Sequence, residues 1–290
     1  MTGLVTKSQG GFYDVFCDGA VYPCKPRGLF RKEKTVILVG DRVEFTPAPG
    51  EVGVIDALFA RKNVFSRPPV SNLDRLFLIA ACAAPAFDPL FADKLSVIAL
   101  HRGVEPVLVL NKCDLGETEP WRDAYGHAGF PVVCTNALTG EGIDELRALL
   151  QGGISAFAGF SGVGKSSLLS RLLGEELAVG EISHALSRGR HTTRHVQLFP
   201  FAGGFVADTP GFSSLELTDL PDLYARDLPA LFPEFAPYLG LCRFPDCTHR
   251  REPGCAVREA SRQGKIAPSR LASYQSFFDL LLALPDWKRS

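Results

Sequence analysis

The sequence predicts a multidomain protein with an N-terminal β-barrel, a central α/β domain and a C-terminal metal-binding helical module. Three observations predict this organisation. Short β-rich runs separated by Gly and Pro fill residues 1–65, apolar strands alternate with helical segments over residues 66–220, and a cysteine cluster precedes a helical tail in residues 221–290. With 290 residues and 46% hydrophobic content, the chain is long enough to form several packed cores.

The first domain is predicted from the β-rich runs at residues 11–16, 35–39 and 41–45. Short strands broken by Gly and Pro are typical of small antiparallel barrels. The Arg67-Pro68-Pro69 sequence then interrupts regular structure, so we expect a linker at this point.

The second domain is predicted from alternating strands and helices. The strands are expected at residues 76–80, 107–110, 132–134, 154–158 and 205–207, and the helices at 91–101, 143–150 and 166–173. Such alternation predicts a mainly parallel sheet with helices on both faces. Strands stop after about residue 220, and the tail at 268–284 is expected to be helical.

Apolar runs in this chain are far shorter than the roughly 18 residues that a membrane span needs. The N-terminal residues 1–7 lack the charged start and apolar run of a secretory signal. We therefore expect a cytoplasmic protein without membrane association. We also expect it to be a monomer.

Charge is unevenly distributed along the chain. Residues 1–65 carry a net charge of +2 and residues 240–290 carry +4, whereas the region between them carries −7. A modest basic excess is usually a solvated face, with a nucleic-acid surface as the alternative.

Residues 159–167 fit the phosphate-loop pattern GxxxxGK[ST], with a strand expected before them and a helix after them. Glycines let successive backbone N–H groups converge on phosphate oxygens. Lys165 is expected to reach the β- and γ-phosphates, and the Ser166 hydroxyl to ligate Mg²⁺. The predicted nucleotide contacts of this loop are Gly159, Phe160, Ser161, Gly162, Val163, Gly164, Lys165, Ser166 and Ser167.

A guanine-reading NKxD pattern is formed by Asn111, Lys112, Cys113 and Asp114 at the end of the predicted strand 107–110. The Asp114 carboxylate can accept from both N1–H and N2–H₂ of guanine, a donor pair that adenine lacks. Lys112 is expected to lay its stem along the purine, and Asn111 to tie this loop to the phosphate loop. Both motifs end strands, where open α/β sheets bind ligands.

A weaker guanine-supporting loop is predicted at Asn136, Ala137 and Leu138. The Ala137 N–H is placed to meet guanine O6. The usual residues beside it are Ser and Lys, so Asn136 and Leu138 depart from the common pattern.

Two switch elements follow the phosphate loop. Asp208 and Gly211 fit DxxG, in which the Asp holds Mg²⁺ through water and the Gly N–H senses the γ-phosphate. The polar loop 187–194 precedes them, and either Thr192 or Thr193 is expected to ligate Mg²⁺, with Thr193 favoured.

The order of these motifs is unusual, because the guanine reader comes before the phosphate loop. Opening the fold elsewhere and joining the old termini preserves every strand-end contact, so the order predicts a circularly permuted P-loop GTPase domain. The Gly211 region then leads directly into the C-terminal module.

Unaided hydrolysis is expected to be slow. Phe212 follows Gly211, where many GTPases carry a Gln that positions the attacking water. Either a partner completes the site or His191 in the switch loop orients the water, a surface role for His191 being the alternative.

Cys242, Cys247, His249 and Cys255 supply three thiolates and one imidazole within 14 residues. This is a ligand set for a structural, tetrahedral Zn²⁺ ion, one per chain. Basic residues beside these ligands strengthen the nucleic-acid interpretation of the C-terminus; they are Arg243, Arg250 and Arg251.

The chain resembles the RsgA family of circularly permuted GTPases that depend on the small ribosomal subunit. The resemblance spans nearly the whole chain and rests on GFSGVGKSS, NKCD, HTT, DTPGF and the Cys-Cys-His-Cys module. It implies an N-terminal OB-like β-barrel, a permuted GTPase domain and a zinc-binding module. It also implies a GTP-hydrolysing factor in late maturation of the small (30S) subunit, stimulated by that subunit and bound to 16S rRNA. Besides Asn136 and Leu138, Arg194 departs from the family pattern, and the net charge is less basic than rRNA binding suggests.

Two other classes of function are compatible with part of this pattern. A metabolic P-loop kinase would use ATP, and Asp114 argues against it. A nucleotide-gated RNA-binding module with incidental hydrolysis is consistent with Phe212.

Overall fold

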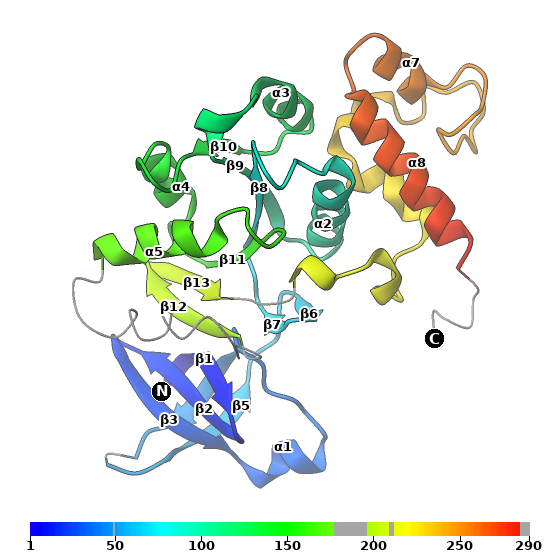
Figure 1. Cartoon of the computed structure of the whole chain (residues 1–290). Helices are drawn as coiled ribbons and strands as arrows, with labels where there is room; N and C mark the ends of the chain where they lie inside the picture. The colour runs from blue at the N-terminus through cyan, green and yellow to red at the C-terminus, as the bar shows by residue number, and fades with distance from the viewer. Residues whose placement is uncertain (49, 177–195, 209–211, 285–290) are drawn as a thin grey trace. The chain divides into compact units, whose positions relative to one another are not determined.

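The computed structural model describes residues 1–48, 50–176, 196–208 and 212–284 (Figure 1). It comprises two compact units, each assembled from several stretches of chain. The first unit contains Met1–Leu76, Asp144–Ala158 and Ser166–Ser214, and the second contains Phe77–Ile143, Gly159–Lys165 and Leu215–Ser290. Stretches far apart in the sequence therefore come together in each unit.

The N-terminal part of the first unit is a closed five-stranded barrel. Its strands are β1 (Thr2–Gln9), β2 (Phe12–Cys17), β3 (Ala20–Pro26), β4 (Arg42–Thr46) and β5 (Gly53–Leu58). They follow the order β1-β2-β3-β5-β4, and β4 pairs back with β1 to close the barrel. A short helix, α1 (Gly28–Lys32), lies between β3 and β4 in the chain. This is the OB-like barrel that was expected.

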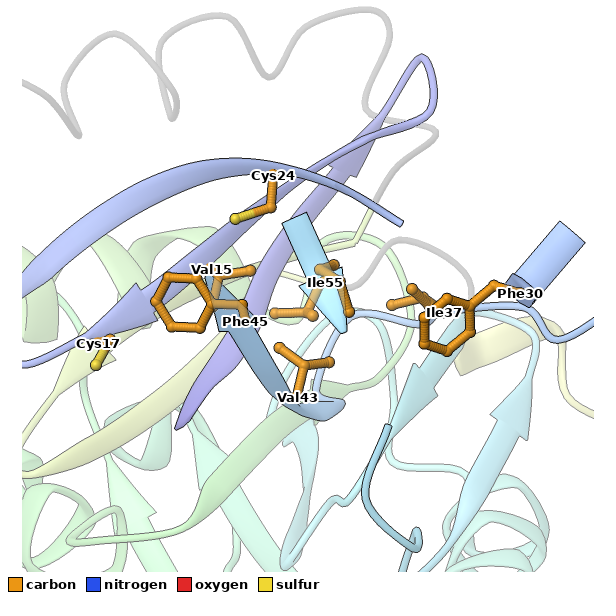
Figure 2. Close-up of a cluster of buried hydrophobic side chains, with 9 residues drawn as sticks. Val15, Cys17, Cys24, Phe30, Ile37, Val43, Phe45 and Ile55 are labelled. Atoms are coloured by element: carbon orange, nitrogen blue, oxygen red, sulfur yellow. The ribbon is translucent and has the colours of Figure 1, made fainter. Parts of the chain in front are cut away.

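The barrel is filled by apolar side chains from all its strands (Figure 2). Val15, Val43, Phe45 and Ile55 have no solvent exposure. Inward apolar residues alternate with outward residues along β4, as a half-buried strand requires.

The β-rich run at residues 35–39 does not form a strand, contrary to the prediction. Only Val39 makes a bridge, an isolated one with Val70. The Leu38 N–H instead donates to the buried carboxylate of Asp41 at 2.7 Å. The Asp41 side chain thus accepts the hydrogen bond that the Leu38 N–H would otherwise donate to a neighbouring strand.

The prediction of a linker at residues 67–69 is also wrong in part. Strands β6 (Val64–Ser66) and β7 (Pro69–Ser71) pair antiparallel, and Arg67 and Pro68 form the turn between them. Proline is tolerated at the first position of a strand, where its missing N–H costs little.

The first unit also holds the strands that lead into and follow the phosphate loop. They are β11 (Ile154–Ala158), β12 (Gln197–Phe201) and β13 (Gly204–Asp208), with helices α4 (Ile143–Leu149) and α5 (Lys165–Glu176). Strand β13 runs parallel to β11 and antiparallel to β12. The predicted strands and helices are confirmed, whereas β12 was not anticipated.

The second unit contains a three-stranded group in the order β10-β9-β8. The elements are β8 (Arg75–Ala81), β9 (Glu105–Asn111) and β10 (Val132–Thr135), with helices α2 (Pro89–His101) and α3 (Glu119–His127) and the 3₁₀ turn η1 (Cys113–Leu115). Strands β9 and β10 are parallel, as predicted.

Residues 212–284 contain helices and turns but no strand, as the sequence indicated. Their elements are the 3₁₀ helices η2 (Phe212–Ser214), η3 (Leu217–Asp219), η4 (Ala225–Leu231) and η5 (Pro233–Tyr238) and the α-helices α7 (Ala256–Arg262) and α8 (Pro268–Leu282). No helix within the described part of the chain is long and apolar enough to cross a membrane.

A buried guanidinium joins helix α8 to helix α2 in the second unit, and the two helices lie side by side (Figure 1). Arg270 donates to Asp93 at 2.7 Å and to both oxygens of Glu234 at 2.7 and 3.1 Å. The Tyr125 hydroxyl donates to the same Asp93 oxygen at 2.7 Å. The side chains of Arg270 and Asp93 are 0% exposed. Burial alone would lower the pKa of Arg270, but the carboxylates of Asp93 and Glu234 raise it overall.

Replacing Arg270 by Met should strongly destabilise the second unit. Two carboxylates would be left buried without their cation, which costs about 3–5 kcal/mol. The shift in the urea unfolding midpoint measures this loss. Arg262→Met is the matched control because Arg262 pairs with Glu259 at the surface, where the loss should be about 0–1 kcal/mol. Equal midpoint shifts in the two variants would contradict the expectation.

Candidate nucleotide site and metal centre

The predicted phosphate loop connects β11 to α5. Two of its glycines lie so close to neighbouring atoms that a side chain would not fit. A Cβ on Gly159 would lie 2.2 Å from the Ile79 carbonyl oxygen, and one on Gly164 would lie 2.2 Å from Asn111 Nδ2. Only glycine fits at these positions, so the loop can curl tightly before the helix begins at Lys165.

Lys165 curls back onto its own loop. Its ammonium donates to the carbonyl oxygens of Gly159 and Phe160, both at 2.7 Å. Burial lowers the pKa of Lys165. Ser166 and Ser167 are exposed in the first turn of α5.

Asn111 joins three loops at one point. Its side-chain amide donates to the Val163 carbonyl at 2.8 Å, and its carbonyl oxygen accepts from the Thr135 hydroxyl at 3.2 Å and from the Ala137 N–H at 3.3 Å. Asn111 is only 1% exposed. The predicted tie between the guanine-reading loop and the phosphate loop is present in the structure.

Thr135 was not a candidate from the sequence. It pairs in register with Asn111 across the parallel strands β10 and β9, which brings its hydroxyl to the Asn111 side chain. The signal that could have identified Thr135 is its position at the end of a predicted strand, next to the strand that carries the NKxD motif.

Lys112 follows Asn111 in a left-handed conformation, with φ of 58°. Its ammonium donates to the carbonyl oxygens of Ala84 and Gly162, both at 2.9 Å. The bond to Gly162 attaches the guanine-reading loop to the phosphate loop a second time. Cys113 is half-buried and Asp114 is exposed in the turn that follows, so the Asp114 carboxylate is accessible to a ligand.

The third loop is shaped by Asn136, whose side chain is buried. Its carbonyl oxygen accepts from the backbone N–H groups of Leu138 and Thr139 at 2.8 and 3.2 Å. The Ala137 N–H, expected to meet guanine O6, donates to Asn111 in this structure. The side chain of Leu138 is 86% exposed.

Several predicted switch residues lie outside the described part of the chain. They are His191, Thr192, Thr193 and Gly211, together with the side chain of Asp208, whose backbone ends β13. Phe212, by contrast, is described and is 1% exposed. Its ring packs edge-to-face on Phe65 with centroids 5.4 Å apart. A buried aromatic ring therefore occupies the position where a water-orienting Gln is common.

The four predicted metal ligands converge in the C-terminal module. Their ligand atoms all lie within 4.8 Å of one another. His249 Nδ1 is 3.5 Å from Cys242 Sγ and 3.4 Å from Cys255 Sγ, and the two sulfurs are 4.0 Å apart. Tetrahedral coordination with metal–sulfur bonds of about 2.3 Å needs separations of about 3.5–3.8 Å. The Cys₃His cluster can therefore hold one metal ion.

Glu252 organises the loop between the metal ligands. Its carboxylate accepts from the backbone N–H groups of Thr248, Arg250 and Arg251 at 2.9, 3.0 and 2.9 Å. Burial would raise the pKa of Glu252, but the hydrogen bonds from Thr248 and the loop backbone lower it to about 2. The Glu252 side chain was not singled out in the sequence.

The basic residues around the Cys₃His cluster differ in their exposure to solvent and in their ion pairing. Arg243 and Arg251 are exposed, whereas Arg250 forms an ion pair with Asp279 of α8 and lies 4.7 Å from the Phe278 ring. The predicted basic surface is therefore smaller than the sequence suggested.

A family model described as RsgA GTPase matches residues 58–218, and one described as RsgA N-terminal domain matches residues 2–55. The chain belongs to the RsgA GTPase family. One relative, the small ribosomal subunit biogenesis GTPase RsgA of Geobacillus thermodenitrificans, is 44% identical over 95% of both chains. The protein of the same name from Carboxydothermus hydrogenoformans is 45% identical over 96% of this chain and 97% of its own.

Two solved structures are similar to this chain over nearly its whole length, which agrees with the family assignment. The crystal structure of YjeQ from Thermotoga maritima matches with a TM-score of 0.82 and 37% identity, covering 98% of this chain and 99% of that one. YloQ, described as a circularly permuted GTPase, matches with a TM-score of 0.79 and 30% identity, covering 97% and 94%. The central domain here is likewise a circularly permuted GTPase domain, as the motif order predicted.

Purified protein should contain one metal ion per chain, and Cys247→Ser should contain none. Loss of one thiolate opens a closed structural site, which then releases its metal to a chelator. Elemental analysis by mass spectrometry measures the content of each metal. Cys82→Ser changes a cysteine outside the cluster and should keep the full metal content. A Cys247→Ser protein that retained its metal would overturn the assignment.

Proposed function

We propose that the chain is a GTP hydrolase that acts in biogenesis of the small ribosomal subunit. The observation that carries the nucleotide site is Asn111, which binds the phosphate loop through Val163 and the third loop through Ala137. Relatives that match the chain over nearly its whole length are named small ribosomal subunit biogenesis GTPases. Their name supports the biological role proposed here.

In this proposal Asp114 reads the guanine edge and Lys112 covers the purine, while Asn136, Ala137 and Leu138 support the base. The backbone N–H groups of the phosphate loop and α5 bind the phosphates. Lys165 exchanges its two carbonyl partners for phosphate oxygens when nucleotide enters. The Gly211 N–H senses the γ-phosphate.

Magnesium would be held by Ser166, Asp208 and Thr193, with Thr192 as the alternative threonine. The exposed hydroxyl of Ser166, in the first turn of the helix that follows the phosphate loop, fits this role. A bound Mg²⁺ neutralises charge that develops on the phosphate oxygens during hydrolysis.

Hydrolysis should be slow without a partner, because the buried ring of Phe212 cannot orient water. The small subunit would complete the site, or His191 would orient the attacking water. These two routes remain alternatives for the group that activates hydrolysis.

The proposed domains are the barrel in residues 1–65, the GTPase domain in 66–220 and a zinc-binding module in 221–290. The barrel and the zinc-binding module contact 16S rRNA, the latter through the exposed Arg243 and Arg251. Zinc is the metal that a closed Cys₃His set selects. The protein would act as a monomer in the cytoplasm, where subunits mature.

Small ribosomal subunits should raise the GTP turnover number by about 100-fold or more, the effect of supplying one missing transition-state group. Phosphate release measured with and without purified subunits tests this. Large subunits are the control and should leave the rate unchanged. Equal stimulation by large subunits would contradict the proposed partner. Nucleotide-dependent subunit binding without any stimulation would instead favour an RNA-binding module whose hydrolysis is incidental.

Asp114→Asn should weaken GTP binding by about 100-fold, because two hydrogen bonds to a charged acceptor are lost. The Asn amide can donate to the O2 atom of xanthine, so the variant should bind xanthosine triphosphate better than GTP. Competition against a fluorescent nucleotide measures both affinities. Asp123→Asn, the same change at an exposed position of α3, should leave GTP affinity unchanged. Unaltered base preference in Asp114→Asn would remove Asp114 from the guanine site.

A further inference from the structure

We propose that Phe91 of helix α2 is a positioning residue for the phosphate loop. Its ring stacks on the ring of Phe160, the second residue of that loop. The ring centroids are 3.9 Å apart and the planes are inclined by 27°. The offset or near-parallel stacking of two aromatic rings stabilises a contact beyond simple burial.

The stack acts on the part of the loop that holds Lys165. The Phe160 carbonyl oxygen accepts from the Lys165 ammonium at 2.7 Å. The phosphate-loop pattern makes no demand on the side chain of Phe160, which is 36% exposed. Its ring is therefore available for the contact with Phe91.

Helix α2 provides a rigid base for this contact. The Phe91 N–H donates to the helix-capping carboxylate of Asp88 at 3.2 Å. Asp93, two residues further, is buried and bound to Arg270. Lys94 pairs with Glu216 at 2.6 Å, and its ammonium lies 5.4 Å from the Phe91 ring centroid. The Phe91 side chain is thus presented from a part of the helix that is held on both sides of this residue.

A fixed phosphate loop binds nucleotide with a smaller loss of conformational entropy than a loop that must order on binding. The stack on Phe160 should therefore tighten binding of nucleotides that carry phosphates at this loop. This inference rests on the proposed GTP binding, and it adds a contact that is made outside the nucleotide site.

The experiment compares Phe91→Leu and Phe91→Tyr by titration with a fluorescent GDP analogue. Phe91→Leu keeps apolar bulk but removes the stack, so the dissociation constant should rise about two- to tenfold. Phe91→Tyr keeps the ring and should bind like the wild type. The nucleotide-free unfolding midpoint of Phe91→Leu should match that of Leu90→Ala, a control at the exposed neighbouring position.

A second variant approaches the stack from the loop side. Phe160→Leu should weaken binding by the same factor, and the double variant with Phe91→Leu should weaken it no further, because both changes remove one contact. Additive losses, an unchanged affinity in Phe91→Leu, or a failure of Phe91→Tyr to restore affinity would each overturn the inference. If the wild type does not bind GDP, the proposed function fails instead.

Discussion

The second unit depends on one buried charge. Arg270 has no access to water, and a guanidinium in such a place is tolerated only when carboxylates satisfy its donors. Asp93 and Glu234 do so, and Tyr125 adds a hydrogen bond to Asp93. These partners come from α2, η5 and α3, so helix α8 packs in one unit with α2 and α3, which precede it by more than a hundred residues. The C-terminal helix is consequently part of the body that carries the guanine-reading loop.

The candidate nucleotide site depends on the uncharged side chain of Asn111, as the second unit depends on the buried charge of Arg270. Asn111 has both a donor and an acceptor on one side chain, and it uses them on two different loops. These contacts require only that the strand ends meet at one edge of the sheet. They do not depend on the order of the strands along the chain. This explains physically why a permuted sequence can retain the same site.

Features with a local signal could be predicted from the sequence. A few consecutive residues are enough to identify a buried strand such as β9, the glycine-rich phosphate loop or the closely spaced candidate metal ligands. The stack of Phe91 on Phe160 and the Arg270 network could not be predicted, because they join residues far apart and because arginine is usually exposed. The strand predicted at 35–39 was wrong for a different reason. The apolar pattern of this run does not show that the nearby carboxylate of Asp41 accepts a hydrogen bond from the Leu38 N–H.

The loop that carries the Cys₃His cluster depends on few of its side chains. Four side chains form the cluster, and Glu252 accepts hydrogen bonds from three backbone N–H groups of the loop. Backbone donors are present whatever side chain a residue carries. Exposed positions such as Arg243 and Arg251 are therefore under little demand from folding. The charge and shape of this surface can therefore change one residue at a time without loss of the loop's fold.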